Sequence, residues 1–237
     1  MKLSEVFEML QYGELANVSM SGDIDEPSGI RVEDYPTLIS HINLALTDLH
    51  TKFNLKEREV VIQQYDEISF YNLESKYAVS NSDSLEPIKY IIDSEDNLFN
   101  DDIIRINSIY DEGGNELPIN DENADNSIYL NSYKRIQIVQ PVSENSIFIL
   151  YRANHNKLDS KNPDLNAEVE LPAYCIEALL SYVASRVHSQ RTSQEAQATA
   201  VNLMSKYNMI CTQLEEKNVL YNSPSNTNFK LGDRGWV

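Results

Sequence analysis

The strongest constraint in this sequence is a pair of helical patterns separated by only a few residues towards its end. Pro172 opens the first pattern, at a position where proline favours the start of a helix. One apolar stripe reaches about residue 189 and the other about residue 220, formed by Ile176, Leu180, Val183 and Val187, and by Ala200, Leu203, Tyr207, Ile210 and Leu214. Because the connection is so short, the two helices must be antiparallel neighbours.

The start of the second helix has its own signal. Thr192-Ser193-Gln194-Glu195 has the form of a capping box, in which a threonine hydroxyl and a glutamate carboxylate each accept a hydrogen bond from a free backbone N–H. We therefore expect Thr192 to cap this helix. Cys175 and Cys211 fall in the two helical patterns, which favours buried reduced thiols over a disulfide or a metal site.

Two further helices are expected near the start of the chain. Residues 3–12 place four apolar side chains at helical spacing, and residues 35–53 follow a capping Asp34 and Pro36. The expected buried stripes are Leu3, Val6, Phe7 and Leu10 in the first, and Ile39, Ile42, Leu46, Leu49 and Phe53 in the second. The polar stretch 13–33 between them is interpreted as a loop.

The middle third of the chain has a different period. Short runs rich in β-branched and aromatic residues alternate there with polar turns, which is typical of strands. The runs are Val60–Ile62, Ile68–Tyr71, Ile88–Ile92, Ile103–Ile106, Ile136–Val139 and Ile147–Tyr151. Gly113-Gly114 lies between two apolar pairs and is a candidate hairpin turn.

The order of these segments predicts an α+β protein: a helical bundle with a long C-terminal antiparallel helix pair and an inserted antiparallel β-domain. We expect residues 1–57 to supply the N-terminal helices of the bundle and 58–152 the inserted β-domain. Residues 153–221 would complete the bundle as a helical hairpin. Residues 222–237 lack an apolar period and are expected to form an extended tail.

The chain is strongly acidic, with 37 Asp and Glu against 19 Lys and Arg, a formal net charge of −18. This balance excludes a general nucleic-acid clamp, which needs clustered basic residues to neutralise phosphates. The N-terminus lacks the pattern of a signal peptide, and no segment approaches the ~18 apolar residues of a membrane span. We therefore expect a protein of the cytosol that does not contact membranes.

Enzyme signatures are absent from the sequence. There is no GxGxxG, GxxxxGK[ST], HExxH or GxSxG motif. The four histidines, which have no second histidine at i+3 or i+4, are interpreted as core or surface residues: His41, His50, His155 and His188. We expect no catalytic residue, no cofactor and no metal site.

Acidic residues between Asp93 and Asp125 leave one alternative open. Eleven acids lie there against Arg105 alone. The first interpretation is a solvent-exposed face with no further role. The second is a negative surface that repels DNA and lets it move past. A Mg²⁺-dependent nuclease using Asp101 or Asp102 is a third.

Two features point to binding. Aromatic residues on one β face would suit a carbohydrate- or protein-binding module on a helical stalk, and Tyr65, Phe70, Tyr71 and Tyr90 are the candidates, although each is also a typical core residue. The tail places the only Trp beside two basic residues, an arrangement that suits an anchor for a partner's pocket. The candidate anchor residues are Phe229, Lys230, Leu231, Arg234 and Trp236.

Several segments together resemble the head-to-tail connector, or adaptor ring, proteins of tailed phages, with the nearest likeness to ring proteins of crAss-like phages. The segments are Tyr151–His155, Val169–Tyr174 and Glu177–Val187, with Asp34–Phe53, Tyr71–Ala78, Asp102–Ile106 and Asp111–Gly114 in the matching order. The resemblance covers about residues 34–221 and rests on order and spacing, since no single motif is specific.

The resemblance implies a structural virion protein, not an enzyme. Its subunits would be made in the host cytoplasm and form a homo-oligomeric ring of about twelve in the virion neck, between the portal protein and the tail rings. DNA would pass through the channel at ejection without sequence-specific binding. The β-domain would contact neighbours or the tail, and the tail segment would reach an adjoining ring.

Overall fold

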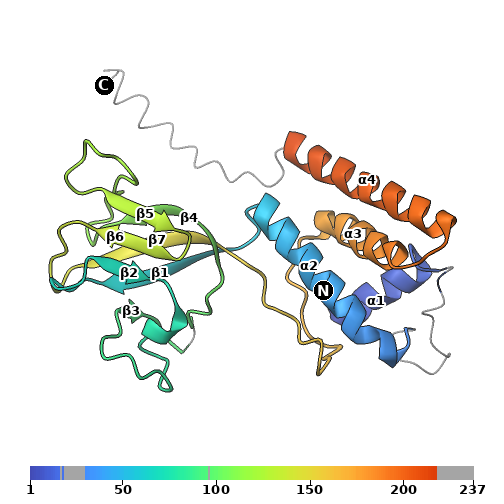
Figure 1. The fold of residues 1–237 in the computed structure, drawn as a ribbon, viewed down its shortest axis with the longest axis horizontal. Coiled ribbons are helices and arrows are strands. Elements are labelled where there is room, and N and C mark those ends of the chain that lie inside the picture. Colours follow the sequence, from blue (N-terminus) through green and yellow to red (C-terminus); the bar gives the residue numbers. More distant parts are fainter. Residues whose placement is uncertain (17, 19–29, 96, 218–237) are drawn as a thin grey trace.

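The chain folds into a helical lobe and a β lobe (Figure 1). This computed structural model describes residues 1–16, 18, 30–95 and 97–217. The helical lobe contains α1 (Leu3–Tyr12), α2 (Tyr35–Lys52), α3 (Ile176–Ser189) and α4 (Gln194–Glu216). Seven strands within the described residues form the β lobe, so the protein is α+β, with the sheets inserted between α2 and the packed pair α3 and α4. The expected tail lies outside the described residues.

The helical lobe is built around the predicted apolar stripes. All four predicted residues of α1 and all five of the stripe on α2 are buried in one cluster. The segment that returns from the β lobe joins this cluster through Leu158 and Val169. It also pairs with the start of the chain, since the backbone N–H of Leu3 donates to Ala167 O at 3.0 Å and that of Val169 donates to Met1 O at 2.7 Å.

The stripe predicted for α3 needs a correction. Val183 and Val187 are buried as expected, but Ile176 and Leu180 are only half-buried, and Cys175 and Leu179 occupy the core positions. A 3₁₀ turn, Ala173–Cys175, precedes the helix. The buried positions Cys175, Leu179, Val183 and Val187 follow a strict spacing of four, which also places residues on one side of a helix, so periodicity alone did not distinguish this stripe from the predicted one.

The cap of α4 also differs from the prediction by one residue. Ser193, not Thr192, is the N-cap, and its Oγ accepts a hydrogen bond from the backbone N–H of Ala196 at 3.2 Å. Glu195 therefore lies at the second helical position, where a capping box cannot form, because that motif needs its glutamate at the third. The predicted capping box is wrong, although the predicted helix start is within two residues.

We expect Ser193→Ala to lower the free energy of unfolding by about 1 kcal/mol, because the N–H of Ala196 loses its acceptor. Thr192→Ala is the matched control, since Thr192 is exposed and does not cap the helix. Urea denaturation of both variants measures the difference. Equal losses in the two variants would contradict the assignment of Ser193 as the cap.

The β lobe consists of two antiparallel sheets. Strands β3 (Ile91–Ile92), β1 (Glu57–Gln63), β7 (Ser146–Ala153) and β4 (Ile103–Tyr110) form one in that order, and β2 (Phe70–Asn72), β6 (Arg135–Ile138) and β5 (Ile128–Ser132) form the other. Ile62 and Ile149 from the first sheet and Tyr71 and Ile136 from the second are fully buried in one cluster. The two sheets therefore share a single core.

Six strand runs were expected, and each of them overlaps a strand of the structure. The run 88–92 is reduced to the two residues of β3, and β5 was not predicted because it offers only Ile128, Tyr129 and Leu130 before polar residues. Gly114, with φ +76°, makes the expected turn after β4. Beyond it the described chain returns to β4 through an isolated bridge between Tyr110 and Glu116, without a second hairpin strand.

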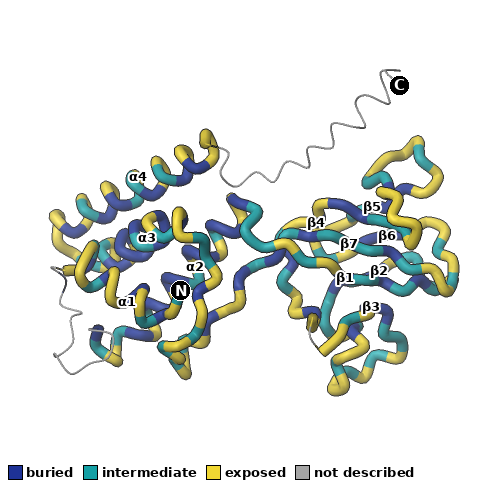
Figure 2. The backbone as a smooth tube through the Cα atoms, turned by 180° about the vertical axis from the view of Figure 1, so that it is seen from behind, coloured by how far each residue is buried: buried dark blue, intermediate teal, exposed yellow. Residues whose placement is uncertain are grey.

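The two lobes have separate cores. The helical cluster draws on residues before 54 and after 157, and the β cluster on residues 60–153. Figure 2 shows buried segments within each lobe and half-buried chain where the lobes join. The two connections are the segment between α2 and β1 and the segment that follows β7, so side chains at this junction must set how the lobes are held together.

Candidate functional site

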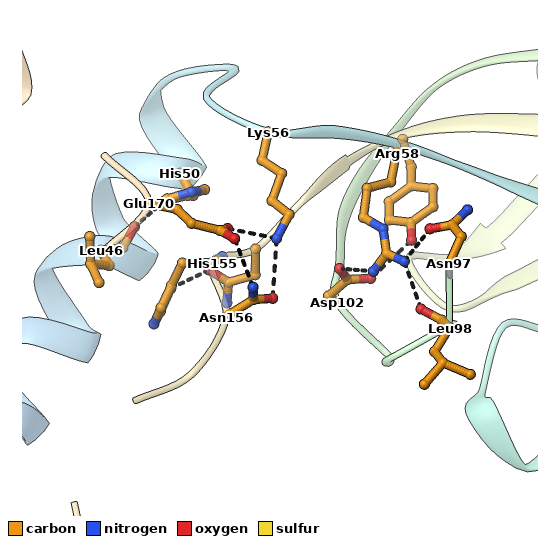
Figure 3. A network of polar contacts seen from close by, with 12 residues as sticks. Leu46, His50, Lys56, Arg58, Asn97, Leu98, Asp102, His155, Asn156 and Glu170 are labelled. Atoms are coloured by element: carbon orange, nitrogen blue, oxygen red, sulfur yellow. Dashed lines mark hydrogen bonds and ion pairs between the residues drawn. The ribbon is translucent and has the colours of Figure 1, made fainter. Parts of the chain in front are cut away.

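The junction between the lobes carries two polar clusters on the adjoining ends of β1 and β7 (Figure 3). Glu57 pairs with Arg152 at this end of the two strands, and Gln63 pairs with Ser146 at the opposite end. The guanidinium Nη1 of Arg152 donates to Thr51 O on α2 at 2.9 Å. The backbone N–H of Ala153 donates to Lys56 O at 2.9 Å. The two connecting chains are thus bonded to each other as they cross.

The first cluster surrounds Arg58 on the β side. Its Nη1 lies 2.9 Å from Oδ2 of Asp102, and Nη2 donates to the side-chain oxygen of Asn97 at 2.5 Å and to Leu98 O at 2.6 Å. Tyr151 Oη donates to the other carboxylate oxygen of Asp102 at 2.9 Å. The side chains of Arg58 and Asp102 are only 15% and 11% exposed, so this ion pair is largely withdrawn from solvent, and both carboxylate oxygens of Asp102 accept hydrogen bonds.

The second cluster surrounds Lys56 on the helical side. Nζ of Lys56 lies 2.8 Å from Oε2 of Glu170 and donates to the side-chain oxygen of Asn156 at 3.1 Å. Asn156 Nδ2 donates to Oε1 of Glu170 at 2.8 Å. These contacts bind Lys56, which precedes β1, to two points on the segment that returns from β7. The two connections are therefore joined to each other by side chains as well as by backbone.

Two buried histidines lie beside the second cluster. His50 and His155 have ring centroids 5.7 Å apart. Nδ1 of His155 lies 2.9 Å from the side-chain oxygen of Asn154, and Nε2 lies 3.1 Å from that of Asn43. A neutral ring can donate to only one of these oxygens. Burial, with the neighbouring His50 and Lys56, nevertheless lowers the pKa of His155 to about 4, and burial also lowers the pKa of His50.

This arrangement predicts acid lability. The unfolded chain takes up a proton at His155 near pH 6.5, whereas the folded chain does so only near pH 4, so stability is present above pH 6.5 and is lost as the pH falls. The loss by pH 4 is expected to be about 3 kcal/mol, with His50 and His41 acting in the same direction. Urea midpoints measured from pH 7.5 to 4 test this, and His155→Gln should flatten the slope. A rise in stability on acidification would instead indicate a protonated ring shared between both asparagine oxygens.

The acidic residues singled out in the sequence serve mainly as hydrogen-bond acceptors in turns. Asp101 accepts from the backbone N–H of Ser75 at 2.6 Å, and Glu112 from that of Ser146 at 2.5 Å. Hydrogen bonds from the Asn115 side chain and backbone hold the pKa of Asp111 below its ordinary value. Within the described residues, no group of three or more His, Cys, Asp or Glu side chains could hold a metal ion. Asp101 and Asp102 have different partners, Ser75 and Arg58.

The cysteines and the aromatic candidates lie mostly in the cores. Cys175 and Cys211 are free and buried, and burial raises the pKa of the Cys175 thiol to about 12; the disulfide alternative is wrong. Tyr71 and Tyr90 are core residues, and Tyr65 packs against the same cluster. Of the four candidates only Phe70 is exposed, with the guanidinium of Arg135 4.3 Å from its ring centroid. The β face therefore offers no row of exposed aromatics from this set.

One surface that sequence reasoning missed lies on α4. Its inner side is fixed by Lys206, which pairs with Glu14 at 2.9 Å and Glu177 at 3.1 Å. Its outer face, named here the α4 outer face, carries no charge between Glu195 and Glu215 and consists of Ala198, Val201, Asn202, Ser205, Asn208, Met209 and Thr212. Val201 and Met209 are 66% and 55% exposed. In so acidic a chain, an uncharged helical face is the surface on which another copy can approach without repulsion.

The five anchor residues predicted in the tail lie outside the described residues. The described residues include no helix long and apolar enough to cross a membrane. Comparison with known protein families found no family whose model matches this chain, and comparison with curated proteins found no match either.

Proposed function

We propose that this protein is a structural virion subunit that assembles into a homo-oligomeric ring connecting a phage portal to the tail. The observation that carries the proposal is the α4 outer face, an uncharged strip of exposed helix on a chain with a net charge of −18. Interfaces between subunits are depleted in charged residues at their centre. Copies in which this face packs against a different surface of the next subunit would place the helical lobes side by side in a closed ring.

The junction supports a mechanical role. A connector transmits position between the layers above and below it, which requires the two lobes of each subunit to keep a fixed geometry. The Lys56–Glu170 pair joins the two connections to each other, and the Arg58–Asp102 pair fixes the end of the β lobe from which they leave. The β lobe is thereby presented at a set angle to neighbouring subunits or to the tail.

The acidic composition supports passage of DNA. A channel wall that neutralised phosphates would release counterions and hold the duplex. A negative wall repels the backbone and leaves DNA free to move at ejection. The proposal therefore includes no cofactor, no metal and no sequence-specific contact with DNA.

Electron microscopy of the purified protein, alone and with the portal protein, tests the proposal. Closed rings of uniform diameter, seated coaxially on the portal, are the expected result. A chain that remains monomeric at all concentrations and joins neither portal nor tail proteins would contradict it. Binding to glycans by such a monomer would instead support the β-module alternative.

A further inference from the structure

The β lobe has a hollow at the end that faces away from the helical lobe. It lies beyond the Gln63 and Ser146 pair, at the opposite end of β1 and β7 from the Glu57 and Arg152 pair at the junction. Its volume is about 430 Å³, within the range of pockets that bind ligands or side chains. We call it the distal hollow.

The distal hollow combines apolar walls with an acidic rim. Ile128, Ile138 and Ile147 line it from both sheets, and Val139 and Val142 add exposed apolar surface, at 52% and 53%. Asp111, Glu112 and Asp125 lie at its edge, and none of its described lining residues is basic. Among the described residues, no ion pair is formed by these three carboxylates. A segment that carries cations beside large apolar side chains would match both features.

The sequence supplies one such segment. Residues 229–237 place Lys230 and Arg234 among Phe229, Leu231 and Trp236, with Asp233 as the only acid. The aromatic side chains suit the apolar walls, because Phe and Trp bury large area at low conformational cost. The two cations suit the acidic rim. Most other parts of this acidic chain would be repelled by the rim, because they carry the same negative charge.

We propose that the segment Phe229–Val237 of one subunit docks in the distal hollow of a neighbouring copy. This inference rests on the proposed ring. If copies meet through the α4 outer face, the chain leaves α4 at Lys217 beside the neighbour. Fully extended, the chain from Lys217 can carry Phe229 at most about 40 Å. The eight residues of β7, which run along the β lobe, span about 26 Å, which is less than this reach. The segment is thus long enough to reach the hollow of a neighbouring copy, and we take that copy as its receptor in place of the adjoining ring protein expected from the sequence.

The only tryptophan of the chain, Trp236, reports on the docking. In the unmodified chain, its emission should shift to shorter wavelength and its quenching by acrylamide should fall as concentration rises and rings form. Sedimentation of the same samples records assembly independently. Closed rings in which Trp236 stays fully quenchable would overturn this inference while leaving the proposed ring intact. A protein that stays monomeric with an exposed Trp236 would overturn both.

Charge reversal at the rim provides the specific test. Asp125→Lys should raise by about tenfold the concentration at which Trp236 becomes shielded, because it places like charges together. Glu122→Lys is the matched control: it makes the same charge change on an exposed residue of the same loop, outside the hollow. Arg234→Glu combined with Asp125→Lys should restore part of the shielding. Equal effects of the two lysine variants would overturn the assignment of the hollow.

Mixing two variants identifies the donor. In the Asp125→Lys chain Trp236 is intact and the hollow is impaired, whereas in a Trp236→Phe chain the hollow is intact and there is no tryptophan. Shielding should return when the two are mixed, because the tail of one copy reaches the hollow of the other. Shielding in monomers of the unmodified protein would show docking within one chain and overturn the proposal. Shielding that appears only after the portal protein is added would assign the tail to the portal instead and would also overturn it.

Discussion

Asp102→Ala is expected to lower the free energy of unfolding of the β lobe by about 3 kcal/mol. The substitution leaves the guanidinium of Arg58 largely buried without its counter-charge and leaves Tyr151 Oη without its acceptor. Removing one member of a buried ion pair costs more than the pair contributes, because the remaining charge is desolvated and unpaired. Asn154 is bonded to the backbone oxygen of Asp102 at 2.7 Å, so the return connection should loosen as well.

Hydrogen exchange resolved by segment measures this effect where it arises. Protection should fall in β4 and β7 and should change little in α4, since the two lobes have separate cores. Glu86→Ala is the matched control, because its pair with Lys76 is 3.5 Å long and lies at the surface, where such pairs contribute less than about 1 kcal/mol. Arg58→Met combined with Asp102→Ala should be less destabilised than the sum of the two single variants.

The same variant separates structure from the nuclease alternative. The position of Asp102 between Arg58 and Tyr151 indicates a carboxylate used to hold the junction. If Asp102→Ala retained full stability and the unmodified protein cleaved DNA with Mg²⁺, the junction role would be contradicted. A stability loss without any cleavage by the unmodified protein is the expected result.

The parts of the fold that the sequence predicts are those fixed by local periodicity. The stripe from Ile39 to Phe53 needs only helical spacing to place its residues in a core, and it was predicted in full. The capping error at Thr192 and Ser193 has a different source, because either hydroxyl can cap and the tertiary position of α4 selects between them. Strand β5 was missed because other segments complete its pairing. Strand β6 pairs with it across a turn, and Ile119 forms an isolated bridge to Ile128.

The junction could not be predicted from the sequence for a related reason. Arg58, Asp102 and Tyr151 meet only after β1, β7 and β4 have paired, and no spacing rule connects positions so far apart. The α4 outer face differs, because a signal was present: of the nineteen residues between Glu195 and Glu215, only Lys206 carries a charge, in a chain of net charge −18. The uncharged face lies opposite the apolar stripe, where periodicity predicts only solvent exposure.

Val201→Glu combined with Met209→Glu is expected to abolish ring formation while leaving the subunit folded. Both side chains are more than half exposed, so the substitutions remove little packing within the monomer. In the assembled ring each interface would gain two negative charges in a region that excludes water, and burying an unpaired carboxylate costs several kcal/mol. With about twelve interfaces in a closed ring, even a partial weakening of each one should shift the population to monomers.

The control is Leu85→Glu, which makes the same kind of change at a residue that is 99% exposed on the β lobe. Sedimentation velocity should find this variant in rings and the α4 double variant as monomers, with equal far-ultraviolet circular dichroism for the two. Salt screens the repulsion between copies as they approach through solvent but not the cost of burying the carboxylates in the interface, so raising the salt concentration should restore only part of the assembly of the double variant. If the double variant formed normal rings, the subunits would have to meet through another surface, and the argument from the uncharged face of α4 would no longer support the connector.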